Sequence, residues 1–517
     1  MGKIPSHPIL TLEAAKRFED QLFGGDEAKE WSAMLQAGSA VGSAAINDFS
    51  ELSRFPDEAR VLVLAGKGHN GGDALLAAKT ILTSHPAARA DVWLFFGERE
   101  LRPLAARAYR ELVQMMPERV RVISRFDALA ESYDLSLDGI FGFQFRPPLA
   151  PALGETFARL NSRVIRFRAA VDLPSGIGDS NALRADFTYA TGSVKSPAVA
   201  EANQPAVGRL RYLDLGFFKR DKANARPSTE DNAEHRSDPS ITDFVLAPDI
   251  LAPLRVLRSP NSDKRTYGHL FMLGGSRSYP GAVMMSALAA LRSGVGLVTA
   301  FVPESLASAY AARVPEVIWV GWPETPVGGL ALEGFHLLRE RIDRADALLL
   351  GPGAARESET LALLADIVKT APVPLVIDAE ALQPEIVRAG SVLRILTPHA
   401  GEFARIAGGA ALLDFSRETK SVTVLKGPLT RISDGLAIYS SCSGGPVLAR
   451  GGSGDVLAGL IGGLLAQQPS EPLIAACRGV AWQGIGADLL ARSQGQVAVH
   501  TTQILDYLAP ALRNDKL

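Results

Sequence analysis

The chain has 517 residues, 47% of them hydrophobic, so it is long enough for two or more domains with fully buried cores. Its 54 basic and 56 acidic residues leave a formal charge of −2, which excludes a general nucleic-acid or membrane-surface binder. Cys442 and Cys477 fit a reducing compartment better than a disulfide framework, and the N-terminus has no apolar signal-peptide core. We therefore expect a cytoplasmic protein that binds neither nucleic acid nor membranes.

The first 218 residues alternate predicted strands and helices. A helical stretch over residues 11–49 precedes a wholly apolar strand at 61–64, and further strands are predicted at 91–96, 120–123, 135–141 and 164–171. Helical segments at 74–83 and 101–115 lie between several of them, and short β-like pieces follow at 187–189 and 210–215. This alternation predicts an N-terminal, Rossmann-like, doubly wound α/β domain over residues 1–218.

A polar, charged stretch over residues 219–240 has almost no apolar side chains and is predicted to be a linker. Residues 241–517 begin a second α/β pattern, with strands at 269–273, 297–302, 347–350, 375–377 and 422–425 and a small-residue helix at 281–293. Asp434-Gly435 stands between alternating apolar residues, which predicts a hairpin. Helices at 456–466, 473–491 and 504–512 close the chain.

Four glycines follow the first predicted strand, in Gly66-Lys67-Gly68-His69-Asn70-Gly71-Gly72-Asp73. Glycines at a strand-to-helix turn let a ligand approach the backbone closely, although a tight turn without any ligand accounts for them too. Asp138 and Asp172 stand where two later strands end, which is the ligand edge of a doubly wound sheet. Aspartates at such positions are also common loop caps, so either one alone is ambiguous. Three polar strand ends in one domain favour a binding site.

These segments resemble the YjeF N-terminal family, the NAD(P)H-hydrate epimerases. The resemblance rests on residues 68–73, the segment around Asp138, and Asp172-Leu173-Pro174-Ser175-Gly176. It implies a potassium ion held by Asn70, Asp138 and Ser175, whose oxygen atoms suit a hard cation. It also implies a catalytic Asp172 and a site for the hydrated nucleotide made of Asn70, Gly71, Gly72, Asp73, Gly142, Phe143, Gln144, Phe145, Arg146, Pro147, Pro148 and Asp172. His69 and residues 143–145 depart from the family pattern, which leaves open a binding or scaffold domain without catalysis.

The stretch Gly451-Gly452-Ser453-Gly454-Asp455 opens the predicted apolar helix at 456–466. Backbone amides at a helix N-terminus bind anions, and Asp455 could take a proton from a hydroxyl group beside them. A capped turn without a ligand accounts for the same residues equally well. Upstream, Ala282 and Gly353 are small residues near predicted strand ends, and His399 lies on a later loop. Dense packing explains one alanine, and a lone histidine is more often structural than functional.

The order of these segments resembles the ribokinase-like superfamily, and within it the ADP-dependent NAD(P)H-hydrate dehydratases, from about residue 264 to residue 463. The shared motifs are Gly-Gly-Ser, Gly-Pro-Gly, Asp378-Ala379, Pro-His-x-Gly-Glu, Lys-Gly and Gly-Gly-Ser-Gly-Asp. The resemblance implies a C-terminal ribokinase-like α/β domain in which Ala282, Gly353, His399 and the catalytic Asp455 face the hydrated nicotinamide nucleotide. It implies a magnesium ion placed by Glu402 through water, and nucleotide binding by Lys426, Gly427, Pro428, Leu429, Thr430, Gly452, Ser453 and Gly454.

Together the two resemblances imply a bifunctional repair enzyme. The first domain would interconvert (R)- and (S)-NAD(P)H hydrate, and the second would dehydrate the (S)-hydrate with ADP as phosphoryl donor, releasing AMP and phosphate. We expect hydrated NADH or NADPH and ADP as small-molecule partners, Mg²⁺ and K⁺ as cofactors, and a homo-oligomer. The alternative is a ribokinase-like small-molecule kinase that keeps its phosphorylated product, attached to a non-catalytic N-terminal domain.

Overall fold

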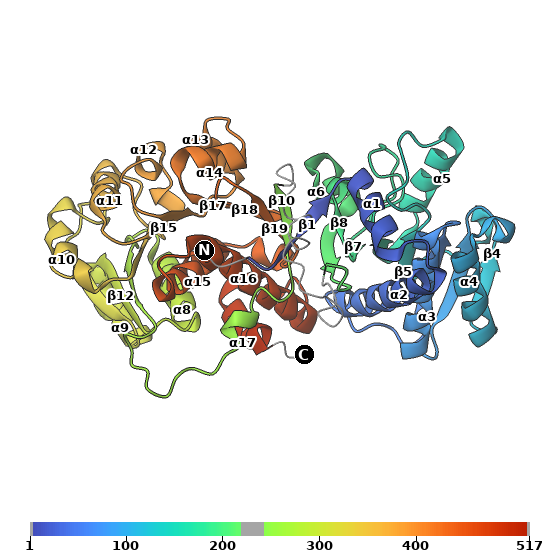
Figure 1. The fold of residues 1–517 in the computed structure, drawn as a ribbon. Coiled ribbons are helices and arrows are strands. Elements are labelled where there is room, and N and C mark those ends of the chain that lie inside the picture. The colour runs from blue at the N-terminus through green and yellow to red at the C-terminus, as the bar shows by residue number, and fades with distance from the viewer. Residues whose placement is uncertain (1–3, 219–241, 514–517) are drawn as a thin grey trace. The chain divides into compact units, whose positions relative to one another are not determined.

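A computed structural model describes residues 4–218 and 242–513 (Figure 1). The chain divides into two compact units. One comprises His7–Ile241, and the other comprises Met1–Ser6 with Thr242–Leu517; we call them the N-terminal and C-terminal units. The linker predicted over residues 219–240 lies outside the described residues, so the domain boundaries stay a prediction.

The N-terminal unit is built from β1 (Ser6–Leu10), α1 (Leu12–Phe23), α2 (Glu27–Phe49), β2 (Arg60–Ala65), α3 (His69–Ser84), β3 (Arg89–Leu94), α4 (Pro103–Met115), β4 (Val120–Ile123), β5 (Ser132–Gly139), α5 (Pro151–Asn161), β6 (Val164–Val171), β7 (Phe187–Thr191), β8 (Val194–Lys195), α6 (Ser196–Val199), α7 (Gln204–Val207) and β9 (Arg209–Leu213). Its main sheet is parallel, in the order β4-β3-β2-β5-β6-β7-β9, and β1 pairs in parallel with β8.

Both faces of this sheet are buried, as the apolar strand at 61–64 predicts. Along β2, Val61 and Val63 pack with α2, α3 and α4, whereas Leu62 and Leu64 pack with Phe157 of α5 on the opposite face. Helices therefore cover both sides, which confirms the doubly wound α/β architecture (Figure 1).

The C-terminal unit is built from β10 (Asp243–Leu246), β11 (His269–Leu273), α8 (Pro280–Arg292), β12 (Leu297–Pro303), α9 (Glu304–Arg313), β13 (Ile318–Trp322), α10 (Phe335–Arg339), β14 (Ala347–Leu350), α11 (Ser358–Thr370), β15 (Leu375–Ile377), α12 (Pro384–Val387), β16 (Arg394–Leu396), α13 (Ala400–Ala407), α14 (Leu412–Thr419), β17 (Val422–Leu425), β18 (Thr430–Ser433), β19 (Ile438–Ser441), α15 (Ser453–Gln467), α16 (Pro472–Gln494) and α17 (Ile504–Arg513). Its sheet runs β13-β12-β11-β14-β15-β16-β17-β18-β19-β10 and is parallel from β13 to β17.

This second sheet is also covered on both sides. In β11, Leu270 and Met272 pack with α8 and α15, while Phe271 and Leu273 pack on the other face with α11 and its neighbours. The antiparallel pair β18–β19 is the hairpin predicted around Asp434-Gly435, and Gly435 has a φ of +85°. Helix α15 is buried from Val456 to Ala466, which explains its continuous apolar run.

Two details of the fold differ from the sequence prediction. The helical stretch at 11–49 is broken into α1 and α2, because Gly24 and Gly25 adopt φ values of +59° and +73° and end the first helix. The strands β1, β8, β10, β13 and β16 were not predicted. β16 has only three residues and begins with an arginine, Arg394, so its apolar pattern is too short to recognise.

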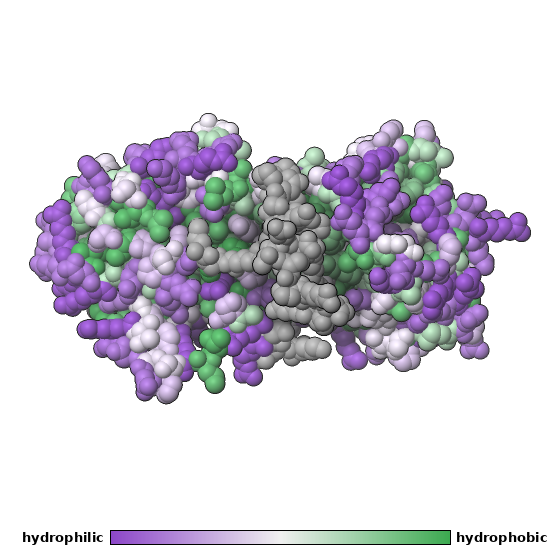
Figure 2. Space-filling view, viewed as in Figure 1, coloured by the Kyte–Doolittle hydropathy of each residue, from purple (hydrophilic) through white to green (hydrophobic). Residues whose placement is uncertain are grey.

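The surface of each unit is mostly hydrophilic on the face drawn in Figure 2. Within residues 4–218 and 242–513, every helix is too short or too polar to cross a bilayer.

Candidate active sites

Most candidate residues of the C-terminal unit lie near the carboxyl ends of the neighbouring strands β11, β14, β15, β16 and β17, and residues 452–455 lie at the start of α15. The strand order reverses between β11 and β14, and open parallel sheets bind ligands at this kind of switch point. The turns after these two strands touch, because the Gly275 amide donates a 2.8 Å hydrogen bond to the Pro352 carbonyl.

Gly353 and Ala282 are in contact at this switch point. Gly353 has a φ of +68°, and a Cβ added there would lie 2.5 Å from the Tyr279 carbonyl oxygen and 2.9 Å from the Ala282 Cβ. No larger side chain fits at position 353 without moving α8. The two small residues leave backbone open beside the strand ends, as a flat ligand requires.

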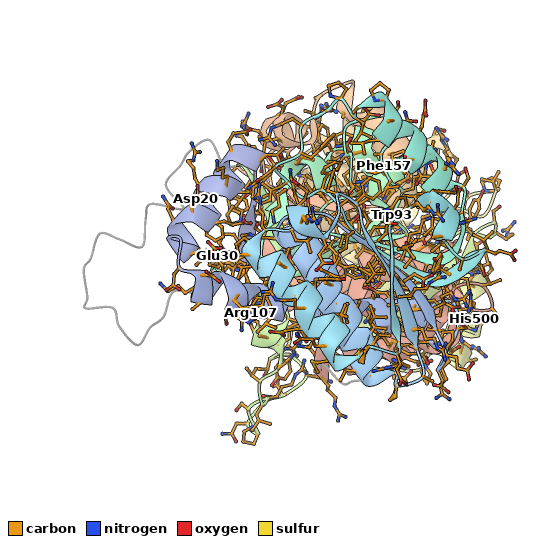
Figure 3. All side chains as sticks on the ribbon, turned by 90° about the vertical axis from the view of Figure 1, so that its right-hand side faces the viewer. Asp20, Glu30, Trp93, Arg107, Phe157 and His500 are labelled. Carbon is orange, nitrogen blue, oxygen red and sulfur yellow. The ribbon has the colours of Figure 1, made fainter. Side chains whose placement is uncertain are left out.

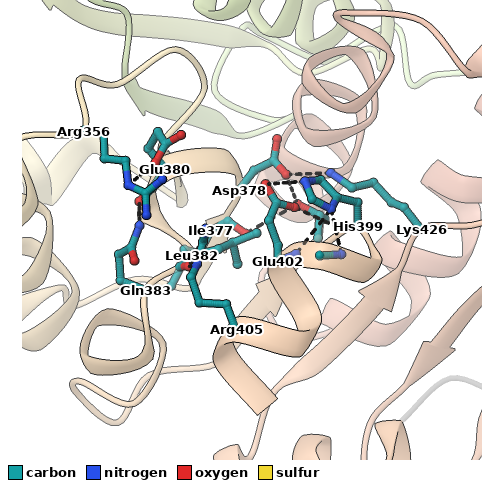
Figure 4. A network of polar contacts seen from close by, with 12 residues as sticks. Arg356, Ile377, Asp378, Glu380, Leu382, Gln383, His399, Glu402, Arg405 and Lys426 are labelled. Carbon is teal, nitrogen blue, oxygen red and sulfur yellow. Dashed lines mark hydrogen bonds and ion pairs between the residues drawn. The ribbon is translucent and has the colours of Figure 1, made fainter. Parts of the chain in front are cut away.

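A largely buried ammonium group, that of Lys426, belongs to the polar network shown in Figure 4. Lys426 Nζ lies 3.1 Å from Asp378 Oδ1, and the Thr397 hydroxyl donates a 2.7 Å hydrogen bond to the same oxygen. A Cβ added to Gly454 would lie 3.1 Å from Lys426 Nζ, so the ammonium rests against the first turn of α15. Burial favours the neutral amine, but Asp378, Glu402 and Asp455 outweigh it and raise the pKa of Lys426.

His399 and Glu402 form a capping box at the start of α13. His399 Nδ1 accepts hydrogen bonds from the amides of Gly401 at 3.0 Å and Glu402 at 3.3 Å, so its proton sits on Nε2. Glu402 Oε2 accepts a 2.8 Å hydrogen bond from the His399 amide, and Oε1 lies 3.5 Å from His399 Nε2. His399 thus has a structural role as well as an exposed imidazole edge.

Side chains from several elements fix the glycine-rich loop before α15. Gly452 has a φ of +88° and is the N-cap residue of the helix. Thr501 donates a 2.7 Å hydrogen bond to the Gly451 carbonyl, and Gln483 donates one of 2.7 Å to the Ser453 carbonyl. The amides of the first helical turn have no intrahelical partners, and they lie at the end of α15 against which the Lys426 ammonium rests. A helix terminus of this kind, beside a cation, is suited to bind an anion.

Asp455 lies in the first turn of α15, and Ser286 donates a 2.8 Å hydrogen bond to its backbone carbonyl. Burial raises the pKa of the Asp455 carboxyl to about 7, and the carboxylate of Asp378 adds to the shift while Lys426 opposes it. A carboxyl group with a pKa close to neutrality is matched to proton transfer at physiological pH.

The N-terminal unit gathers its candidate residues at its own switch point, between β2 and β5. Asp138 at the end of β5 is buried and accepts hydrogen bonds from the Ser175 hydroxyl at 2.6 Å and the Ser175 amide at 2.7 Å. Burial raises the pKa of Asp138 to about 6 against these hydrogen bonds. Asn70 Nδ2 donates a 2.8 Å hydrogen bond to the Phe141 carbonyl, so the three residues predicted to hold potassium converge on one place.

Close packing of the backbone also explains Gly66 and Gly71, two glycines of the predicted loop after β2. A Cβ on Gly66 would lie 1.9 Å from the Ile140 carbonyl oxygen, and one on Gly71 would lie 2.1 Å from the Gly66 carbonyl oxygen. The backbone segments after β2 and β5 are therefore in direct contact. Glycine is needed here for the turn itself, whatever the ligand.

A second buried ammonium group lies beside this loop. Lys195 Nζ is 2.6 Å from Asp172 Oδ1 and 3.8 Å from Glu19 Oε1, and only 2% of the Lys195 side chain is exposed. Asp172 has a φ of +64°, which is rare for a residue with a Cβ and occurs where surrounding structure holds a functional side chain. Burial, with Asp172 and Glu19, raises the pKa of Asp73 well above its ordinary value.

The remaining predicted residues lie around these clusters. Phe143 faces Lys195, whose Nζ is 5.4 Å from the ring centre, and a Cβ on Gly142 would lie 3.3 Å from the Asn70 Cβ. Arg146 forms a 3.0 Å ion pair with Glu13 of α1. The other predicted site residues are close to these clusters in the sequence but make no described contact with their charged groups: Gly72, Gln144, Phe145, Pro147, Pro148, Gly427, Pro428, Leu429 and Thr430.

Three charged residues of these clusters had no predicted role. Asp378 follows β15 directly, so the strand-end argument that selected Asp138 and Asp172 also applies to it. Lys195 lies on β8, which has only two residues and therefore no recognisable pattern. Glu19 lies on an exposed helix far from every motif in the chain, and no sequence signal marks it. Among the described residues, His, Cys, Asp and Glu side chains nowhere form a group of three that could hold a metal ion.

Comparison with known proteins assigns each unit to a family. Residues 32–196 match the family described as YjeF-related protein N-terminus, and residues 270–510 match the family described as NAD(P)H-hydrate dehydratase. A relative from Thermosynechococcus vestitus is 34% identical over 98% of both chains, and one from Moorella thermoacetica is 32% identical over 88% of both. Each is named bifunctional NAD(P)H-hydrate repair enzyme Nnr.

Among solved structures, an ADP/ATP-dependent NAD(P)H-hydrate dehydratase from Bacillus subtilis, co-crystallized with ATP and Mg²⁺, is 26% identical with a TM-score of 0.46. The alignment covers 53% of this chain and 98% of that protein. A ribokinase-like superfamily protein from Enterococcus faecalis is 28% identical with a TM-score of 0.45, over 52% of this chain and 95% of that one.

Proposed function

The chain belongs to the bifunctional NAD(P)H-hydrate repair enzymes, with an epimerase unit followed by a dehydratase unit, and we propose that Asp455 and Lys426 carry the dehydration. The observation that carries this proposal is the meeting of three features in one place: the Asp455 carboxyl, the Lys426 ammonium and the N-terminus of α15. Membership of this family argues against both alternatives, a kinase that keeps its product and an N-terminal domain without catalysis.

In the proposed reaction, the ring hydroxyl of the (S)-hydrate attacks the terminal phosphorus atom of ADP. Asp455 accepts the hydroxyl proton as the oxygen–phosphorus bond forms, and AMP leaves with the electron pair of the broken phosphoanhydride bond. Phosphate then leaves the ring with the electron pair of the carbon–oxygen bond. The neighbouring ring carbon gives a proton to water, and the electron pair of its carbon–hydrogen bond restores the double bond. The pKa of Asp455, about 7, allows it to be ionised before the first step at neutral pH.

The nucleotide phosphates would lie between Lys426 and the amides of residues 452–454. An ammonium and a helix N-terminus both stabilise the negative charge that spreads over a phosphoryl group during transfer. The turn Gly427-Pro428-Leu429-Thr430 would hold the rest of the nucleotide, and Ala282 with Gly353 would leave room for the nicotinamide ring. The preference for ADP as donor is part of this proposal.

The arrangement of Glu402 is compatible with a magnesium ion held through water. Its Oε2 accepts a 2.8 Å hydrogen bond from the His399 amide, and its Oε1 lies 3.5 Å from His399 Nε2. Mg²⁺ at phosphate-transfer sites keeps several waters and takes most direct ligands from the phosphates, which suits a carboxylate one water away. The ion, when bound, neutralises phosphate charge.

In the epimerase unit, we infer that Asn70, Asp138, Ser175 and the Phe141 carbonyl would hold potassium. Asp138, Ser175 and Phe141 supply oxygen atoms within one hydrogen-bonded cluster, and such atoms suit a large, hard cation. The hydrated nucleotide would lie along residues 71–73 and 142–148, with Asp172 as a catalytic carboxylate. The ion, when bound, supplies a fixed positive charge beside the nucleotide.

Substitution of Asp455 by Asn in the full chain tests the proposed roles. With the (S)-hydrate and ADP, we expect the return of reduced-nicotinamide absorbance to fall by at least about 100-fold, because a general base contributes roughly 10²–10⁴-fold. Interconversion of the two hydrates should continue at the wild-type rate. Asp366→Asn, on the exposed face of α11, is the matched control and should leave both activities unchanged. Persistent dehydration, or loss of both activities, would contradict the assignment.

A further inference from the structure

The strongest unassigned feature of the molecule is the position of α1 over the epimerase site. Ala15 is the buried residue of this helix, and Phe18 and Phe23 pack against Phe218 and Phe217. Polar contacts connect the helix to the site: Glu13 pairs with Arg146 at 3.0 Å, and Glu19 lies 3.8 Å from Lys195 Nζ. The helix therefore brings a carboxylate to the charged cluster.

The charges of this cluster do not balance. One ammonium, Lys195, faces the three carboxyl groups of Glu19, Asp73 and Asp172, so full ionisation would leave two uncompensated negative charges in a largely buried place. Carboxyl groups crowded together in this way tend to keep protons, because each negative charge disfavours ionisation of the others. Asp172 forms an ion pair with this ammonium, since its Oδ1 lies 2.6 Å from Lys195 Nζ.

We propose that Glu19 is the catalytic acid of the epimerase, giving its proton to the ring hydroxyl of the hydrate. The proposal deepens the epimerase assignment and rests on it. Glu19 is more distant from Lys195 than Asp172 is, and 28% of its side chain is exposed against 8% for Asp172. It is therefore placed to exchange a proton with a molecule bound on the loops that α1 overlies.

The chemistry of the substrate explains why an acid is needed. Hydration of the ring double bond places the hydroxyl on the carbon bonded to the ring nitrogen, because that carbon bears the positive charge when its neighbour is protonated. Glu19 gives its proton to the hydroxyl oxygen, the carbon–oxygen bond breaks, and water leaves with the electron pair. The nitrogen lone pair then forms a carbon–nitrogen double bond, and Asp172 and ionised Glu19 stabilise the resulting cation.

Return of water to the opposite ring face completes the epimerisation. The new carbon–oxygen bond forms, the double-bond electrons return to nitrogen, and the released proton goes back to Glu19. No oxidant or further reactant is required. Burial raises the pKa of Glu19 to about 7, with Lys195 opposing the shift, so the carboxyl holds its proton near neutral pH. The charged groups that face Glu19 from the elements around it are Lys195 of β8, Asp172 after β6, Asp73 of α3, Asp20 of α1 and Glu30 of α2, the last two of which are labelled in Figure 3.

The test measures the rate at which the full-chain protein, supplied with pure (R)-hydrate, ADP and Mg²⁺, restores reduced nicotinamide. Under these conditions epimerisation limits the rate. We expect the wild-type rate to fall about tenfold per pH unit above about pH 7, as Glu19 loses its proton. Glu19→Gln should lower the rate at pH 6.5 by roughly 100-fold and abolish this pH dependence. Glu27→Gln, at an exposed carboxylate in the first turn of α2, is the control and should stay within about twofold of wild type.

A Glu19→Asp variant distinguishes loss of the acid from damage to the fold, because it should keep the pH dependence at a reduced rate. A Glu19→Gln rate equal to wild type would overturn the proposal. So would a slower variant that keeps the wild-type pH dependence, or a dependence that disappears in Asp73→Asn and not in Glu19→Gln. A wild-type rate no faster than spontaneous interconversion would overturn the epimerase assignment together with the proposal.

Discussion

Replacement of Asp455 by Asn should make the C-terminal unit more stable at the same time as it abolishes dehydration. The native carboxyl has a pKa of about 7 against an ordinary value of 3.8, a shift of about 3 units. At 1.36 kcal/mol per unit, ionising Asp455 costs the folded state roughly 4 kcal/mol relative to the unfolded chain. An amide of the same shape avoids this cost. Because water can reach a partly exposed carboxyl and reduce the cost, we expect a gain of at least about 2 kcal/mol.

The sign of the effect depends on pH in a defined way. Below about pH 4 the carboxyl is protonated in both states, so the variant has no advantage. Between about pH 4 and pH 7 the unfolded chain ionises while the folded protein holds its proton, so wild-type stability falls with rising pH. Above about pH 7 both states are ionised and the difference stays at its full value.

Thermal unfolding of the C-terminal unit at pH 8.5 and pH 5 measures this difference. A gain of 2 kcal/mol corresponds to a rise in melting temperature of roughly 4–8 °C for a unit of this size, and the rise should shrink at pH 5. Asp366→Asn should show no rise at either pH, because its carboxylate is exposed on α11. Equal melting temperatures of Asp455→Asn and wild type at pH 8.5, or an advantage of the same size at pH 5, would refute the reasoning.

Three further outcomes are expected. Asp378→Asn should move the acid limb of the dehydration pH profile to lower pH, because the Asp378 carboxylate helps raise the pKa of Asp455; an unchanged limb in kcat/KM would contradict this. Gly353→Ala should abolish dehydration, since its Cβ would lie 2.5 Å from the Tyr279 carbonyl oxygen, whereas Gly408→Ala, with a φ of +59° and open space, should cost only about 1–2 kcal/mol of stability and keep activity. Replacing K⁺ by Na⁺ should slow epimerisation and leave dehydration unchanged, and equal effects on both would argue against the potassium site.

Much of the architecture was predictable because it depends on local patterns. The continuous apolar strand at 61–64 requires helices on both sheet faces, and the Asp434-Gly435 hairpin follows from turn chemistry. Asp138 and Asp172 could be selected because parallel strands bring their carboxyl ends to one edge. The three residues of β16 and the break at Gly24-Gly25 were less predictable, because the first pattern is very short and the second interrupts an otherwise helical composition.

The sequence alone therefore indicated which loops are candidates to carry the chemistry, since glycines before an aspartate place open backbone amides next to a carboxylate. Only the tertiary structure decided which charges meet there. Lys426 pairs with Asp378, which lies 48 residues earlier in the sequence. Glu19 contacts Lys195, although the two residues lie near opposite ends of their unit in the sequence. The pKa values near 7 of Asp455 and Glu19 arise from burial beside these partners. Burial is a property of the assembled fold, and no local pattern encodes it.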